Sequence, residues 1–210
     1  MNVMTGLRAP FLACLVLIPA GTAVGVATLP DLLPRDEEIA LALSAAPAHL
    51  RAGAAVYVLE KTGFIQVRSG SNGFTCIVNR DHPSSRKPTC YDAEGTATIV
   101  PKVLRIGELL ARGTPLAEIQ AEIAEGFRSG KFIAPRRPGI AYMLSDGNRD
   151  VDPITGTISR FPPHVMFYAP NLTNEQIGST GDGANGLPFL AYPGPHAFII
   201  MMVPEWHGAP

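Results

Sequence analysis

The feature that most constrains the fold is a run of three strand-like segments joined by very short connections. The segments span residues 54–60, 63–69 and 73–80, and the connections are a Lys-Thr pair and a Gly-Ser-Asn turn. All three are rich in the β-branched and aromatic residues that favour strands. Because connections this short favour antiparallel neighbours, the sequence predicts an N-terminal three-stranded meander.

Apolar residues at helical spacing predict three helices. One short helix precedes the strands at 35–46, and a pair follows them at 96–113 and 114–130. In the last of these, Thr114 can cap the helix and Pro115 suits its first position. The apolar stripes of the pair predict that both helices face the core.

Strand-like runs return after the helices, separated by long loops at 146–163 and 171–188 that are rich in Gly, Pro and Asn. These runs are 139–145, 164–170, 189–192 and 196–203. The order strands, helices, strands predicts an α+β fold. We expect a single domain over 28–210 with a mainly antiparallel sheet, in which the meander and the C-terminal strands are packed by the helical pair.

The N-terminus is typical of an export signal. One basic residue, Arg8, precedes an apolar run, and Ala27 is the small residue expected before a cleavage site. Pro19 and Gly21 interrupt the run, so it is too short for a stable membrane helix, which needs roughly 20 apolar residues. The sequence predicts a signal peptide at 1–27, a periplasmic or extracellular protein, and no stable membrane insertion after cleavage.

Cysteine usage agrees with export. Loss of the signal would remove Cys14 and leave Cys76 and Cys90, and an even pair in an exported chain predicts a disulfide. In the chain-entropy model a loop of this length stabilises the fold by roughly 3 kcal/mol. The alternative, two thiolate metal ligands, lacks a close C-x-x-C spacing.

Charge and motifs exclude several function classes. Removing the signal takes away Arg8 and no acidic residue, so the net charge goes from −1 to −2. This balance predicts no nucleic-acid partner and leaves a small molecule or a protein as the expected partner. The sequence contains no G-x-S-x-G or H-E-x-x-H motif, which are hydrolase signatures.

Two Pro-His pairs stand at the start of apolar strand-like runs, at His164 and His196. If 189–192 forms a strand between these runs, both histidines start parallel strands at one edge of the sheet, roughly 10 Å apart between backbones. The pattern predicts a shared metal or ligand site walled by the 171–188 loop, with Tyr168 on the same strand face as His164.

Further ligands for that site are available. His82 would follow the third strand near the disulfide, and Asp146 and Asp92 supply carboxylates. Histidine nitrogens favour zinc or copper over calcium. Calcium would instead use the alternating oxygens of Asp146, Asn148, Asp150 and Asp152, in a pattern that departs from the EF-hand loop.

Two functional hypotheses therefore stand. One is an exported metal-binding protein, in which an open metal position would permit metal-dependent catalysis. The other is a non-catalytic extracytoplasmic module stabilised by the disulfide, in which the histidines are ordinary strand-entry residues and the long loops bind a partner or small ligand.

Overall fold

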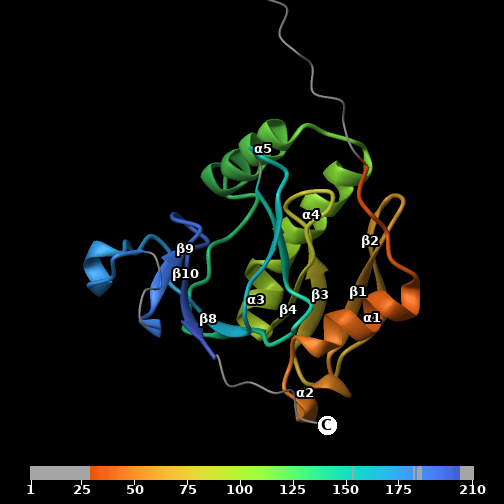
Figure 1. The fold of residues 1–210 in the computed structure, drawn as a ribbon, viewed down its shortest axis with the longest axis horizontal. Coiled ribbons are helices and arrows are strands. Elements are labelled where there is room, and N and C mark those ends of the chain that lie inside the picture. The colour runs from red at the N-terminus through yellow and green to blue at the C-terminus, as the bar shows by residue number, and fades with distance from the viewer. Residues whose placement is uncertain (1–28, 153, 182, 184–185, 204–210) are drawn as a thin grey trace, which may run out of the picture.

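An eight-stranded sheet organises the protein (Figure 1) in the computed structural model, which describes residues 29–152, 154–181, 183 and 186–203. The strand order is β2-β1-β3-β4-β5-β8-β10-β9. The strands are β1 (Ala55–Glu60), β2 (Gly63–Arg68), β3 (Thr75–Asn79), β4 (Lys87–Tyr91), β5 (Ile140–Met143), β8 (His164–Tyr168), β9 (Phe189–Ala191) and β10 (Phe198–Met202). The α+β fold class, the single domain and the mainly antiparallel sheet are confirmed.

The order of the first three strands differs from the expected meander. β1 and β2 form the antiparallel hairpin, but β3 pairs with β1 and runs parallel to it. Burial explains this order. β2 is largely solvent-accessible, as suits an edge strand, whereas nearly every residue of β3 is buried. A strand that is apolar on both faces is more stable in the middle of the sheet.

Strand β4 was not predicted from the sequence. All five of its residues are buried, and Cys90 pairs directly with Cys76 of β3. The predicted Cys76–Cys90 disulfide is confirmed, and it joins two neighbouring strands. The strand is hard to predict because it contains Lys87 and Pro88, and neither residue type favours the interior of a strand.

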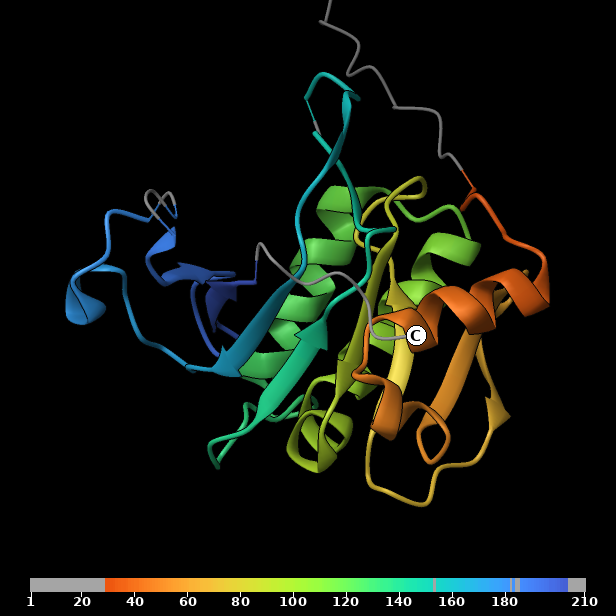
Figure 2. The ribbon, with the colours of Figure 1, turned by 60° about the horizontal axis from the view of Figure 1, so that its bottom comes forward.

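Helices cover both faces of the sheet (Figure 2). Helix α1 (Arg35–Ser44) packs on the face that carries Val56, Val78 and the disulfide. Helices α3 (Ala93–Thr98) and α4 (Val100–Ala111) pack on the other face, against Ile77, Tyr91 and Met166 among others. The sheet is therefore the middle of three layers.

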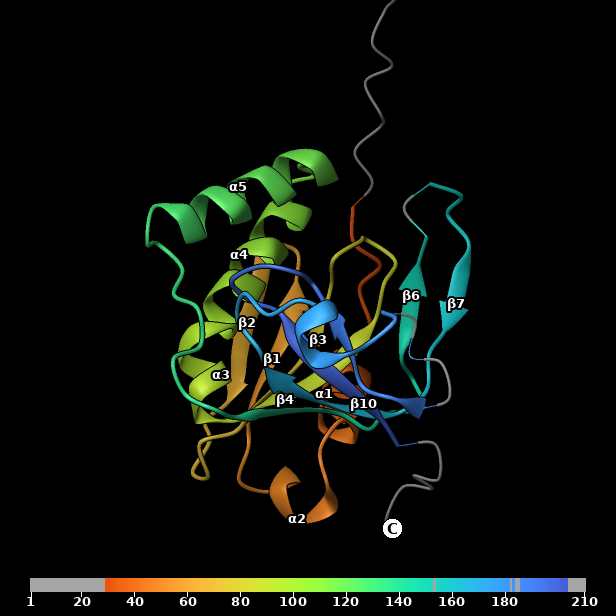
Figure 3. The same cartoon turned by 90° about the vertical axis from the view of Figure 1, so that its left-hand side faces the viewer.

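Of the two helices predicted at 96–113 and 114–130, only the first lies against the sheet. Helix α5 (Leu116–Arg128) lies outside α4, away from the strands (Figure 3), and packs on α4 through Leu109, Ile119 and Ile123. The predicted first helix of the pair is divided into α3 and α4 around Ile99 and Pro101, since proline has no N–H for the helical ladder.

The remaining elements are small. α2 (Ala48–Arg51) follows α1 and η1 (Glu175–Ile177) lies in the 171–188 loop. The 146–163 loop contains a separate antiparallel hairpin of β6 (Arg149–Val151) and β7 (Ile158–Arg160). None of the described helices has the length and apolar character needed to cross a membrane. The predicted signal peptide falls outside the described residues.

Candidate functional site

Three adjoining cavities meet on the α4 side of the sheet. The central cavity, about 80 Å³, lies between α4 and strands β3, β4 and β8. The His164 cavity, about 280 Å³, continues from it over β8 and β10. The α4–α5 cavity, about 300 Å³, continues in the other direction. The last is lined by Asp81, Lys102, Ile106, Leu116, Ile119, Gln120, Ile123, Ala124, Tyr192 and His196.

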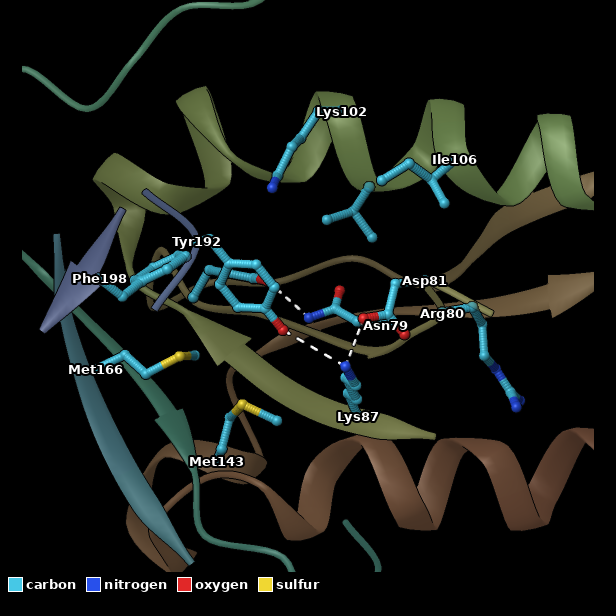
Figure 4. A pocket seen from close by; sticks show the side chains of 12 residues that line it. Asn79, Arg80, Asp81, Lys87, Lys102, Ile106, Met143, Met166, Tyr192 and Phe198 are labelled. Atoms are coloured by element: carbon cyan, nitrogen blue, oxygen red, sulfur yellow. Dashed lines mark hydrogen bonds and ion pairs between the residues drawn. The ribbon is translucent and has the colours of Figure 1, made fainter. Parts of the chain in front are cut away.

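Tyr192 is common to all three cavities. Its backbone has φ 54°, in the left-handed region. For a bulky residue this conformation costs about 1–3 kcal/mol and persists where the surroundings hold it, often at functional sites. Figure 4 shows the Tyr192 ring in the central cavity, near Lys87.

Lys87 lines both the central and the His164 cavities and pairs with one carboxylate of each, Asp81 of the central cavity and Asp150 of the His164 cavity. The Lys87 ammonium pairs with Asp81 from the β3–β4 turn and with Asp150 of β6, the latter at 2.9 Å. Burial disfavours the charge on Lys87, but the Tyr192 oxygen, Asp81 and Asp150 outweigh it and raise the pKa of Lys87 above its usual value. Lys87 is therefore held as a cation, and its ammonium hydrogens are already donated to these partners.

Lys102 differs from Lys87 in having no such partner. It extends from α4 into the cavity (Figure 4) and lines both the central and the α4–α5 cavities. Within the described part of the chain, its amine has no hydrogen-bond or ion-pair partner. Lys102 is half-buried, and burial lowers the pKa of its amine to about 7, opposed by the charge of Asp81, which lines the same two cavities.

His196 stands at the same end of the site as Lys102. Its ring stacks on Phe127 of α5 with centroids 5.0 Å apart, and lies 6.3 Å from the Tyr192 ring. Its Nδ1 is buried and has no hydrogen-bond partner among the described residues. Burial, with a smaller effect of Lys102, lowers the pKa of His196 to about 4, so the imidazole is neutral at pH 7.

The two histidines do not share one site, contrary to the sequence prediction. β9 is the edge strand rather than the strand between, and β10 pairs directly and antiparallel with β8. His164 is opposite Met202 in this register, so His196, which precedes β10, lies at the other end. His164 instead lines the His164 cavity, where its Nδ1 is 3.0 Å from the Pro162 carbonyl oxygen. Burial lowers the pKa of His164.

The proposed additional ligands are also dispersed. His82 accepts a hydrogen bond from the Ser84 backbone N–H through Nδ1, and Asp146 is exposed. Asp92 caps α3 by accepting from the Gly95 N–H, and Tyr168 donates its hydroxyl hydrogen to Asp92 at 2.8 Å. Tyr168 is therefore a structural link between β8 and α3 rather than part of the ligand pocket.

The alternating oxygens of the suggested calcium loop do not converge. Asn148 is buried and donates to the Met143 carbonyl, Asp150 pairs with Lys87, and Asp152 accepts from the N–H groups of the turn that follows it. Among the described residues, no group of three or more His, Cys, Asp or Glu side chains is placed to hold a metal ion. The zinc, copper and calcium hypotheses thus have no geometric support.

Sequence reasoning missed Lys102, although the sequence holds a signal for it. Ile99, Val103 and Ile106 form the apolar stripe of α4, and Lys102 lies three residues after Ile99 and four before Ile106. It therefore interrupts a core-facing stripe with a charge, which is an unusual arrangement. Comparisons with protein-family models, with curated proteins and with solved structures gave no match for this chain. The geometry of the cavities therefore carries the functional argument.

Proposed function

We propose that the protein is an extracytoplasmic binding module for a small, mainly apolar molecule whose hydrogen-bond-accepting head faces Lys102. The buried Cys76–Cys90 disulfide is compatible with an oxidising compartment, and the apolar N-terminal segment supports export to it. No specific observation favours a metal-dependent enzyme.

The observation that carries this proposal is the unpartnered Lys102 amine in an aliphatic cavity. Ile106, Leu116, Ile119 and Ile123 supply apolar walls around it. Lys102 is half-buried, and partial removal of an amine from water without a compensating partner is unfavourable; sites with such shifted groups are often functional. A ligand acceptor atom would restore the missing hydrogen bond, while the ligand's apolar part would bury against the isoleucines.

The size of the cavity limits the ligand. At about 300 Å³ the α4–α5 cavity lies at the lower end of the range for small-molecule sites, which is roughly 300–1,000 Å³. Linear six-carbon molecules with different heads are therefore suitable probes. Hexanoate and hexanamide present acceptors to Lys102, whereas hexylamine presents only a cation.

We expect hexanoate and hexanamide to bind, as measured by titration calorimetry and by chemical-shift changes at α4 and α5. Lys102→Met should weaken hexanoate binding at least about tenfold, since a hydrogen bond to a charged group contributes roughly 1.5–3 kcal/mol. Lys131→Met is the matched control, because Lys131 lies on the surface and pairs with Glu122. Equal binding of hexylamine, or unchanged hexanoate binding by Lys102→Met, would contradict the proposal.

A further inference from the structure

We infer that Lys102 is an amine nucleophile that forms a Schiff base with the carbonyl carbon of a small aldehyde or ketone in the α4–α5 cavity. The inference deepens the proposed function and rests on it, because the carbonyl compound would occupy the same cavity. It narrows the accepting head of the ligand to a carbonyl group and adds a covalent step.

The geometry leaves the Lys102 amine without an anionic partner among the described residues. An amine that donates to carboxylates is held protonated, as Lys87 is by Asp81 and Asp150, and has no lone pair for attack. Lys102 has no such carboxylate contact in the described residues and extends into open cavity space. The lowered pKa of Lys102 agrees with this arrangement, because a desolvated lysine is the form that enzymes use for Schiff-base chemistry.

The surroundings suit the condensation. Ile106, Leu116, Ile119 and Ile123 give the α4–α5 cavity a largely aliphatic lining, and apolar surroundings disfavour the charged form of an amine. His196 and Tyr192 line the same cavity, and both carry groups that can pass a proton. The unpartnered Nδ1 of His196 provides a free position for one end of such a transfer.

The step balances without any co-reactant. The Lys102 nitrogen forms a bond to the carbonyl carbon, and the π electron pair of the C=O bond moves to oxygen. One proton passes from nitrogen to that oxygen and gives a carbinolamine. Loss of the hydroxyl group with the second nitrogen proton releases water and leaves a C=N bond. Hydrolysis reverses the sequence.

The test is reductive trapping with hexanal. The full mature protein is incubated with hexanal and sodium cyanoborohydride at pH 7, and the hexyl-modified lysines are located by peptide mass spectrometry. The lysines of the chain are Lys61, Lys87, Lys102 and Lys131, so each site can be followed separately. We expect modification at Lys102 to be at least tenfold faster than at Lys61 and Lys131, and to be slowed by hexanoate.

Two variants complete the experiment. Lys102→Arg keeps a cation but removes the nucleophilic amine, so the fast modification should disappear, whereas Lys131→Arg should retain it. Equal modification of Lys102 and the exposed lysines would overturn the inference. If hexanoate binds as proposed while hexanal leaves Lys102 unmodified, the Schiff base is contradicted and the binding function stands.

Discussion

Replacing Arg80 by methionine should lower the free energy of unfolding by about 3–5 kcal/mol, because it leaves a buried carboxylate without its counter-charge. The Arg80 and Glu38 side chains are 0% and 1% exposed, and their Nη2 and Oε2 atoms are 3.4 Å apart. Arg80 extends away from the central cavity toward α1 (Figure 4). Among the described residues, only the Leu59 N–H still donates a hydrogen bond to Glu38 when the guanidinium is lost.

The pH dependence identifies the cause of this loss. Burial already raises the pKa of Glu38 despite the opposing effect of Arg80. In Arg80→Met the pKa of Glu38 should rise further, so the deficit should be largest at neutral pH and should shrink as acid protonates the carboxyl. Urea unfolding at pH 7 and pH 5 measures both effects.

Two further variants serve as controls for Arg80→Met. Arg35→Met breaks an ion pair with Glu60 whose side chains are 55% and 42% exposed, and should cost no more than about 1 kcal/mol. The double variant Glu38→Gln with Arg80→Met removes both charges and should recover much of the stability. A loss below about 1 kcal/mol for Arg80→Met would contradict the assignment of Glu38 and Arg80 as a coupled buried pair.

Removing the disulfide should produce the second large effect. The double variant Cys76→Ala with Cys90→Ala should lose about 3 kcal/mol, because the cross-link closes a loop over a sequence separation of 14. For a domain of this size the melting temperature should fall by roughly 6–12 °C. Calorimetry of the variant and of the oxidised protein measures the difference.

Accessibility provides an independent check on the disulfide. Both cysteines are 0% exposed, so mild reductant should not cleave the bond until the fold opens. Protein reduced in denaturant and refolded under reducing conditions should match the double variant in stability. Thiols that titrate in the oxidised native protein, or a double variant that melts with the parent, would refute the stabilising role of the cross-link.

Local sequence patterns predicted where the helices and strands lie better than they predicted which elements lie next to one another. The apolar stripe placed α5 correctly, and the paired cysteines predicted a bond that the structure contains. The predicted start was wrong in detail, because Pro115 is the N-cap and Thr114 makes no side-chain cap hydrogen bond among the described residues. Strand order depends instead on long-range burial. Nothing near β3 in the sequence shows that it lies beside β1, and β9 has the same strand character whether it occupies an edge or an interior position.

The dependence of strand order on long-range contacts also explains why the two histidines lie apart. The prediction for His164 and His196 depended on strand polarity, and a single change in the order of β9 and β10 moved them to opposite ends. The role of Lys102 depends on which carboxylates reach it. Asp81 and Asp150 both pair with Lys87 rather than with Lys102. This pairing is determined by the folded sheet and the β6–β7 hairpin, which the local sequence does not reveal.

The most direct test of the central claim is the titration of the Lys102 amine. Its ¹³Cε and ¹⁵Nζ resonances, assigned by comparison with Lys102→Met, can be followed by NMR from about pH 5 to pH 11. An unpartnered amine in the aliphatic cavity predicts a midpoint near the pKa of about 7, against roughly 10.4 for an ordinary lysine. The folded state would then be least favoured below pH 7 and gain stability as the pH rises toward 10. A midpoint above about pH 10 would show that Lys102 is hydrated or paired, and would contradict the account.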